Sequence, residues 1–114
     1  MNIDKTLFAG SSSMLILKLL EREDLYGYKM IERLAVLSCD TFSLKAGTLY
    51  PLLHNLEAKG LIESYEKTAE NSKMRKYYSI TPKGIKTLRD KEKEWTVYCD
   101  AVNNVLLKGV FVNG

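Results

Sequence analysis

The feature that most constrains the fold is a stripe of leucines between residues 45 and 60. In this stretch, KAGTLYPLLHNLEAKG, leucines recur at three- and four-residue spacing, at positions 49, 52, 53 and 56. That spacing predicts a helix with one buried face. Gly60 stands where a helix C-cap would fall, and the run from Leu61 to Lys67 is typical of a strand.

The other side of the predicted helix is polar, with the hydrogen-bonding side chains of Thr48, Tyr50, His54 and Asn55. A short helix with a polar edge, joined to a strand, is what a winged helix-turn-helix offers to a DNA groove. The alternative is an ordinary amphipathic helix of a small α/β domain. Pro51 lies near the helix start, and the residue four positions earlier is Gly47, so we expect the helix to continue through the proline.

Composition sets broad limits on function. The chain has 114 residues, which suits one domain, and its net charge of +3 is compatible with nucleic acid without being diagnostic. Cys39 and Cys99 lie far apart without metal-ligand spacing, so we expect reduced thiols and neither metal nor cofactor. With no signal pattern and no membrane-length apolar run, the sequence predicts a cytoplasmic protein without a membrane partner.

Two helices are predicted before the leucine stripe. The apolar run after Gly10-Ser-Ser-Ser13 predicts a buried helix over about 11–22, preceded by an N-terminal arm at 1–13. The serine run is a flexible linker or a set of small residues for close packing, and we favour packing. A second helix is expected over 28–37, with Asp24 as its N-cap.

A β-hairpin is predicted after the leucine stripe, from strands at 61–67 and 75–81 around a polar turn. Its tip and returning strand carry Lys73, Arg75 and Lys76. A charge run is often only a solvated face. Because this one lies beside a candidate recognition helix, we favour contact with DNA phosphate.

The last element is a long helix that starts at Thr81-Pro82, where threonine can cap and proline suits the first turn. Its side chains form an a/d heptad stripe over three heptads: Ile85, Leu88, Glu92, Trp95, Cys99, Val102 and Leu106. A narrow apolar seam needs a partner, so we favour a homodimer over packing on the same chain. The interface residues would be Ile85, Leu88, Trp95, Cys99, Val102 and Leu106. The tail at 110–114 is expected to fray or dock partly.

The predicted fold class is α+β, mainly α: a winged helix-turn-helix followed by a long C-terminal dimerisation helix. Residues 1–81 would form the DNA-binding part with its N-terminal arm. Residues 82–114 would form the dimerisation helix and tail, with one compact domain overall.

Several short motifs occur together at fixed separations: Tyr26-Gly-Tyr28, Gly47-Thr-Leu-Tyr-Pro51 and Arg75-Lys-Tyr-Tyr78, with Gly60-Leu-Ile62 and Gly84 between and after them. From about Met14 to Gly84 the chain resembles the PadR transcriptional regulators, and its single helix after the hairpin resembles their short-form (subfamily 2-like) branch. The resemblance implies a homodimer on a palindromic double-stranded DNA operator, with repression relieved by a small molecule.

We expect the DNA contacts to come from the helix at the leucine stripe, the hairpin and the start of the preceding helix. The predicted contact residues are Tyr28, Lys29, Lys45, Thr48, Tyr50, His54, Lys73, Arg75 and Lys76. Two positions depart from the family: Lys45 replaces the usual Ser or Asn cap, and Ser72-Lys-Met-Arg75 replaces a tip often written Gly-Arg-Arg-Arg.

Trp95 is the only tryptophan in the chain. In some drug-responsive relatives a tryptophan at the matching place stacks on flat aromatic molecules, and an indole face suits stacking. The alternative is that Trp95 only fills the dimer core. The candidate effector site comprises Leu7, Phe8, Ser11, Met14, Glu92, Trp95, Tyr98 and Cys99. Glu92 would favour cationic ligands, or would only face solvent.

The sequence does not predict an enzyme. His54 has no evident catalytic partners, and no Gly-rich phosphate loop is present. Two alternatives to an effector-responsive regulator remain: a protein-interaction module that uses the heptad seam, and a redox-sensing regulator that uses Cys99.

Overall fold

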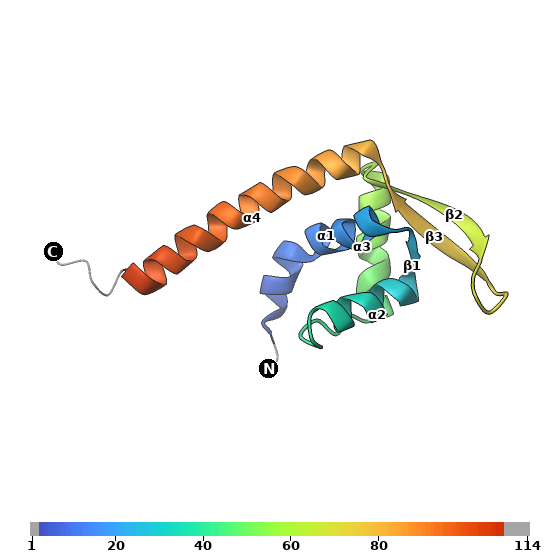
Figure 1. Cartoon of the computed structure of the whole chain (residues 1–114), viewed down its shortest axis with the longest axis horizontal. Coiled ribbons are helices and arrows are strands. Elements are labelled where there is room, and N and C mark those ends of the chain that lie inside the picture. Colours follow the sequence, from blue (N-terminus) through green and yellow to red (C-terminus); the bar gives the residue numbers. More distant parts are fainter. Residues whose placement is uncertain (1–2, 109–114) are drawn as a thin grey trace.

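The computed structural model describes residues 3–108, which form four helices and one small sheet. Figure 1 shows their order along the chain. The elements are α1 (Lys5–Arg22), β1 (Leu25–Tyr26), α2 (Gly27–Leu37), α3 (Ala46–Ala58), β2 (Ile62–Thr68), β3 (Met74–Ile80) and α4 (Pro82–Lys108). The predicted tail at 110–114 lies outside the described residues.

Helix α1 begins six residues earlier than its sequence pattern predicts. The carboxylate of Asp4 accepts hydrogen bonds from the Thr6 backbone N–H at 2.8 Å and the Thr6 hydroxyl at 2.7 Å, so it caps the helix. Ser11 and Ser12 are buried, and their hydroxyls donate to backbone carbonyls one turn earlier. The serine run is therefore a packing surface inside a helix, as favoured above, and the expected arm is largely helical.

The N-cap predicted at Asp24 is wrong, because the chain between α1 and α2 forms a short strand. Leu25 and Tyr26 pair antiparallel with Tyr78 and Tyr77 of β3. Helix α2 then starts at Gly27 with no side-chain cap. Asp24 instead accepts a hydrogen bond from the Tyr65 hydroxyl at 2.6 Å.

Helix α3 forms as its leucine stripe predicts, with Pro51 inside it. Leu49, Leu53 and Leu56 are almost completely buried. The helix ends where Gly60 adopts a φ of 74°, the left-handed conformation that glycine accepts without strain. The backbone N–H groups of Gly60 and Leu61 then donate to the carbonyls of Glu57 and Leu56, which satisfies the end of the helix.

The sheet has the strand order β1-β3-β2, and all its pairings are antiparallel. The hairpin of β2 and β3 projects beyond the helices as a wing (Figure 1). Together with α2 and α3, it makes the molecule a winged helix-turn-helix.

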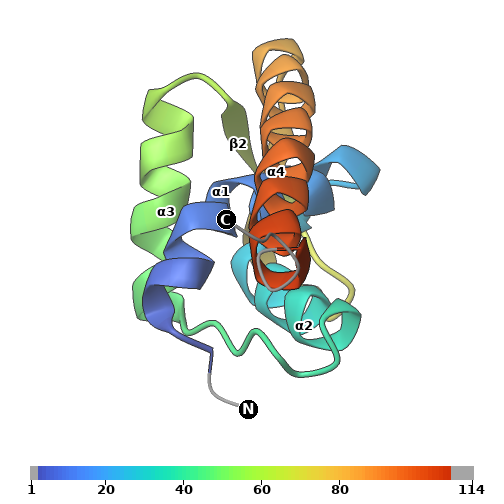
Figure 2. The same cartoon turned by 90° about the vertical axis from the view of Figure 1, so that its left-hand side faces the viewer.

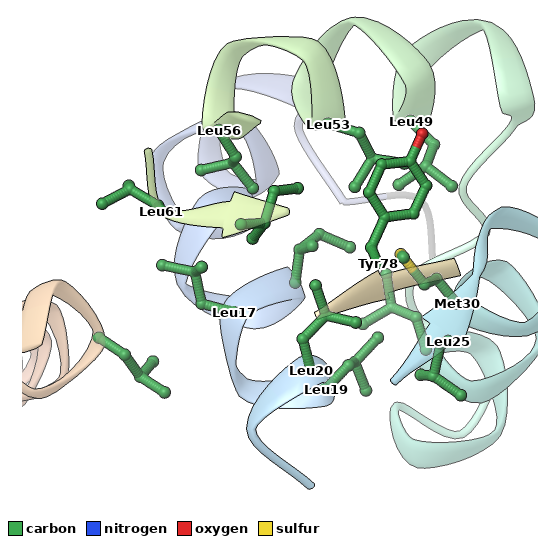
Figure 3. Packing of buried hydrophobic residues seen from close by; sticks show 14 of the residues in the cluster. Leu17, Leu19, Leu20, Leu25, Met30, Leu49, Leu53, Leu56, Leu61 and Tyr78 are labelled. Carbon is green, nitrogen blue, oxygen red and sulfur yellow. The ribbon is translucent and has the colours of Figure 1, made fainter. Parts of the chain in front are cut away.

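The core lies where α1, α3 and one face of the sheet meet. Figure 3 shows Leu17 and Leu20 of α1, Leu53 of α3 and Tyr78 of β3 turned toward one another. Helix α4 contributes to this core only through Leu88, which is fully buried. Beyond Leu88 the helix runs past α1 and away from the other elements (Figure 1), in a molecule measuring 65 × 31 × 21 Å. No helix within residues 3–108 is long and apolar enough to cross a membrane.

Candidate nucleic-acid interface

The outward edge of α3 is the first part of the candidate interface. In Figure 2, α3 stands at the left-hand edge with no other element outside it. Lys45, Thr48 and His54 are all exposed along the helix, as are Pro51 and Asn55. A DNA major groove is wide enough to admit an α-helix, and no other element covers this edge of α3.

Lys45 occupies the N-cap of α3 and, as predicted, leaves it without a side-chain cap. The backbone N–H groups of Ala46 and Gly47 consequently have no side-chain cap, and a lysine stands at the positive end of the helix dipole. This end of α3 attracts anions, phosphate groups included.

Tyr50 lies differently from the other predicted contacts on α3. It is half-buried and packs against the core. Its hydroxyl lies directly over the backbone of Gly27, where an added methyl group would come within 2.4 Å of the oxygen. Tyr50 therefore joins the first turn of α3 to the start of α2, and it presents less surface to DNA than Thr48 does.

The first turn of α2 supplies the next two predicted contacts. The Tyr28 ring is 58% exposed. The Lys29 ammonium lies 3.7 Å from the Glu32 carboxylate, one turn along the same helix. An exposed pair of this kind is weak, so Lys29 stays available to another anion.

The wing carries the remaining predicted contacts. Its turn is closed by a backbone hydrogen bond from Ala69 to Lys73 of 2.7 Å and by a left-handed Ser72, with φ of 62°. Lys73 and Lys76 are exposed. Arg75 is half-buried, and its guanidinium carbon lies 5.2 Å from the centre of the Tyr26 ring.

Two residues of this region are absent from the sequence predictions. Lys67 pairs with Arg75 across the strands, and Tyr26 lies under the Arg75 guanidinium. Strand alternation places Lys67 on one face, but only the register between β2 and β3 shows that it faces Arg75.

The hydrogen bond between Tyr65 and Asp24 ties β2 to the segment before α2. This bond, reinforced by partial desolvation of the hydroxyl, raises the pKa of Tyr65 to about 12. Tyr65 therefore remains a neutral donor at physiological pH, and the hydrogen bond helps hold the wing against the helix-turn-helix.

The apolar seam of α4 is mostly exposed in a single chain. Trp95 is 42% exposed, Val102 38% and Leu106 66%, and Ile85 is also exposed while Cys99 is half-buried. Leu88 is the exception among the predicted interface residues. At 0% exposure it is already covered by its own subunit, so it has no surface left for a partner.

A groove of about 390 Å³ lies between α1 and α4. Of the predicted effector residues it brings together Leu7, Met14, Trp95 and Tyr98. Its other lining residues, absent from the predictions, are Thr6, Gly10, Lys91 and Glu94. Thr6 and Gly10 have no large apolar side chain, and Lys91 and Glu94 lie outside the heptad stripe, so the sequence pattern gave no signal for these four residues.

The other predicted effector residues lie outside this groove. Phe8 packs on Phe42 with ring centres 5.2 Å apart, and Ser11 is buried. Glu92 lines a smaller groove beside Trp95, but it is held by Lys18 at 3.2 Å and Arg89 at 2.9 Å. These two ion pairs lower the pKa of Glu92, with Lys18 the stronger influence. Its charge is therefore already neutralised by the protein.

The chemistry of a metal centre is not assembled within residues 3–108, where no group of three or more His, Cys, Asp or Glu side chains converges. The arrangement instead offers cations, helix N-termini and hydrogen-bonding groups along one polar helix and one wing. Groups of these kinds are the ones that proteins use to contact the phosphates of nucleic acids.

Comparison with known proteins points the same way. Residues 16–90 match the model of the "Transcriptional regulator PadR-like family". The chain is similar to a PadR family transcriptional regulator from Eggerthella lenta, with 39% identity and a TM-score of 0.78 over 90% of this chain and 87% of that one. It is also similar to a PadR-like transcriptional regulator from Bacillus cereus, with 32% identity and a TM-score of 0.80 over 90% and 97% of the two chains. An uncharacterized protein from Lysinibacillus sphaericus is 34% identical over 78% of this chain and 82% of its own length.

Proposed function

Because this chain belongs to the PadR-like family of transcriptional regulators, we propose that it is a homodimeric repressor that binds a palindromic DNA operator in the cytoplasm. Each subunit places α3 in a major groove and the wing against flanking phosphates. The observation that supports this most directly is the exposed polar edge of α3, with an uncapped N-terminus and the basic wing on the same chain.

In this proposal, contacts to base edges provide specificity, and contacts to phosphate provide affinity. Thr48 and His54, exposed on α3, read base edges, while Lys45, Lys73 and Lys76 neutralise phosphate. Tyr28 and Lys29 contact the backbone from the start of α2, and Tyr50 positions α3 more than it reads bases.

The test is fluorescence anisotropy with duplexes tiled across the DNA upstream of the gene, set against a scrambled duplex. Thr48→Ala should lower the preference for the operator by about 0.5–1.5 kcal/mol, the contribution of one hydrogen bond to a base. Lys73→Gln should weaken binding to both duplexes and lower the log–log salt slope by about one unit. Lys93→Gln, the same charge change on the exposed side of α4, is the control. A wild-type protein that prefers no upstream segment over the scrambled duplex would refute the proposal.

The proposed dimer rests on the exposed apolar side chains of α4. The side chains of Trp95, Val102 and Leu106 are exposed along one helix. Burying such an apolar seam against a second copy of the chain is favourable. A two-fold dimer would also match the two halves of a palindromic operator.

The proposed effector is a planar aromatic molecule held in the groove between α1 and α4. Its volume of about 390 Å³ falls within the usual range for small-molecule sites. The Trp95 and Tyr98 rings, 6.3 Å apart, offer aromatic faces for stacking. Lys91 and Glu94 line the same groove with opposite charges, so stacking rather than net charge would select the ligand.

Trp95 fluorescence provides the measurement, because the chain contains no other tryptophan. Planar dyes should quench its emission saturably and release operator DNA, with a coupling of about 1–3 kcal/mol. Tyr98→Ala should weaken dye binding, whereas Val97→Ala, an exposed neighbour outside the groove, should not. Emission that no dye alters would leave the repressor without this effector site.

A further inference from the structure

The outer face of the sheet carries a ladder of three tyrosines. Tyr65 and Tyr77 face each other across β2 and β3 with their rings stacked, 5.8 Å apart at 18°. Tyr77 also meets Tyr26 of β1 edge to face, at 5.4 Å and 73°. Because cross-strand partners share one face of a sheet, the three rings form a continuous aromatic surface.

Two cations rest on this surface. The Arg75 guanidinium lies 5.2 Å from the Tyr26 ring centre and 5.9 Å from that of Tyr28. The Lys67 ammonium lies 5.3 Å from the Tyr77 ring centre. Contact with the ring faces holds both cations in place without neutralising them.

The two cations also face each other. Lys67 and Arg75 are direct partners in the β2–β3 register, and like charges in this position repel. Within residues 3–108 neither one forms an ion pair with a carboxylate. On the opposite face of the same hairpin, by contrast, Glu66 is the partner of Lys76.

Arg75 has a second unmet requirement. Its Nε is buried and has no hydrogen-bond partner among the described residues. A buried donor without a partner is costly. An anion bound between the two side chains would relieve the repulsion between their charges.

The position of this cation pair favours a phosphate of the DNA backbone. Arg75 reaches Tyr28 in the first turn of α2, a helix end without a side-chain cap. Tyr50 joins this turn to the start of α3, the proposed recognition helix. The pair therefore lies on the wing, and Arg75 adjoins the start of α2 through Tyr28, where a strand of the duplex would pass.

We propose that Lys67 and Arg75 form a seat for one backbone phosphate, and that Tyr26 is the positioning residue that sets the Arg75 guanidinium toward it. The proposal rests on the DNA-binding function proposed above. Lys67 belongs to the seat although it lies on β2, away from the basic run of β3. The planar fork of arginine suits a phosphate better than a lysine at the same place.

The test compares variants of Tyr26 in two backgrounds. Tyr26→Phe keeps the ring and should bind a duplex like wild type, since no side-chain hydrogen bond within residues 3–108 involves the Tyr26 hydroxyl. Tyr26→Leu removes the ring and should weaken binding several-fold. In an Arg75→Gln background, the change from tyrosine to leucine should have no further effect. A purely structural Tyr26 would instead lower the affinity in both backgrounds, together with the melting temperature.

Salt titrations test the seat itself. Lys67→Gln and Arg75→Gln should each lower the log–log slope of duplex binding by about one unit, and Lys93→Gln should leave it unchanged. If the wild type and the Lys93→Gln control bind DNA but neither seat variant changes the slope, the seat is refuted while the repressor proposal stands. If the wild type binds no duplex, both fail. Inorganic phosphate at matched ionic strength distinguishes a site for free phosphate from a site for the DNA backbone. If free phosphate binds in a manner that depends on Arg75, while both seat variants keep the wild-type duplex affinity, the proposal is also overturned.

Discussion

At the scale of single residues, Gly84 fixes where α4 meets the rest of the subunit. A methyl group there would lie 2.1 Å from the Leu61 carbonyl oxygen and 2.7 Å from a side-chain carbon of Ile80. The Gly84 backbone N–H also donates to the Thr81 hydroxyl at 3.0 Å, and that hydroxyl donates to the Gly60 carbonyl at 2.7 Å. The start of α4 is thus connected by hydrogen bonds, through the Thr81 hydroxyl, to the end of α3.

Gly84→Ala should consequently destabilise the protein, by about 1–3 kcal/mol or more, because backbone must move to admit the methyl group. Gly10→Ala is the matched control. It lies within α1 with nothing within 4 Å of the added methyl group, so it should raise stability by about 0.5–1 kcal/mol. Urea denaturation followed by circular dichroism measures both. Equal stabilities of the two variants would contradict the close approach.

At the scale of elements, four charged side chains join α1 to α4. Lys18 lies 3.1 Å from Glu21 and 3.2 Å from Glu92, and Arg89 pairs with Glu92 at 2.9 Å and with Glu21. The Arg89 and Lys18 hydrogen bonds lower the pKa of Glu21, with Arg89 the stronger influence. A closed network of this kind fixes the angle between α1 and α4 better than isolated ion pairs do.

The lowered pKa values of Glu21 and Glu92 predict a loss of stability in acid. Both carboxyls have an ordinary pKa of 4.5, so the stabilisation is fully present above that pH and disappears as pH falls through the lower values of the folded state. Between pH 5 and pH 3 the wild type should lose more of its melting temperature than the double variant Glu21→Gln, Glu92→Gln. Glu63→Gln with Glu70→Gln, two exposed glutamates, is the control. Parallel curves for all three proteins would show that the network adds nothing to stability.

At the scale of the whole molecule, α4 has two parts that differ in their burial. Its first part belongs to the subunit core through Leu88, and its second part extends past α1 with its apolar side chains exposed. Val102 and Leu106 are exposed in the single chain, and they are the apolar surface that the proposed dimer would bury.

Substitutions in the two parts should therefore separate folding from assembly. Val102→Asp places a charge in the proposed interface, so it should yield a folded monomer by light scattering. Leu88→Ala leaves a cavity in the core, so it should lower the free energy of unfolding by about 2–5 kcal/mol. The Leu88→Ala protein, where folded, should still dimerise. A dimeric Val102→Asp protein would exclude this part of α4 from the interface.

The sequence by itself determined the elements that local pattern encodes. The leucine stripe defined α3, Gly60 its end, Thr81 and Pro82 the start of α4, and the two β-rich runs the wing. These features depend on neighbours within one or two turns, so periodicity and capping residues suffice. The charges of Lys73 and Lys76 and the exposed position of Thr48 also followed from their places on those elements.

The tertiary structure alone decided features that depend on residues far apart in the chain. The strand β1 has two residues and no period of its own, and it exists because Leu25 and Tyr26 pair with β3. Leu88 and Val102 fit the same heptad stripe, yet only Leu88 reaches the core. The later turns of α4 extend beyond the core, so Val102 stays exposed. Arg75 meets Tyr26 only through the strand register. A local pattern indicates which face of an element is apolar, but it does not indicate what that face will meet.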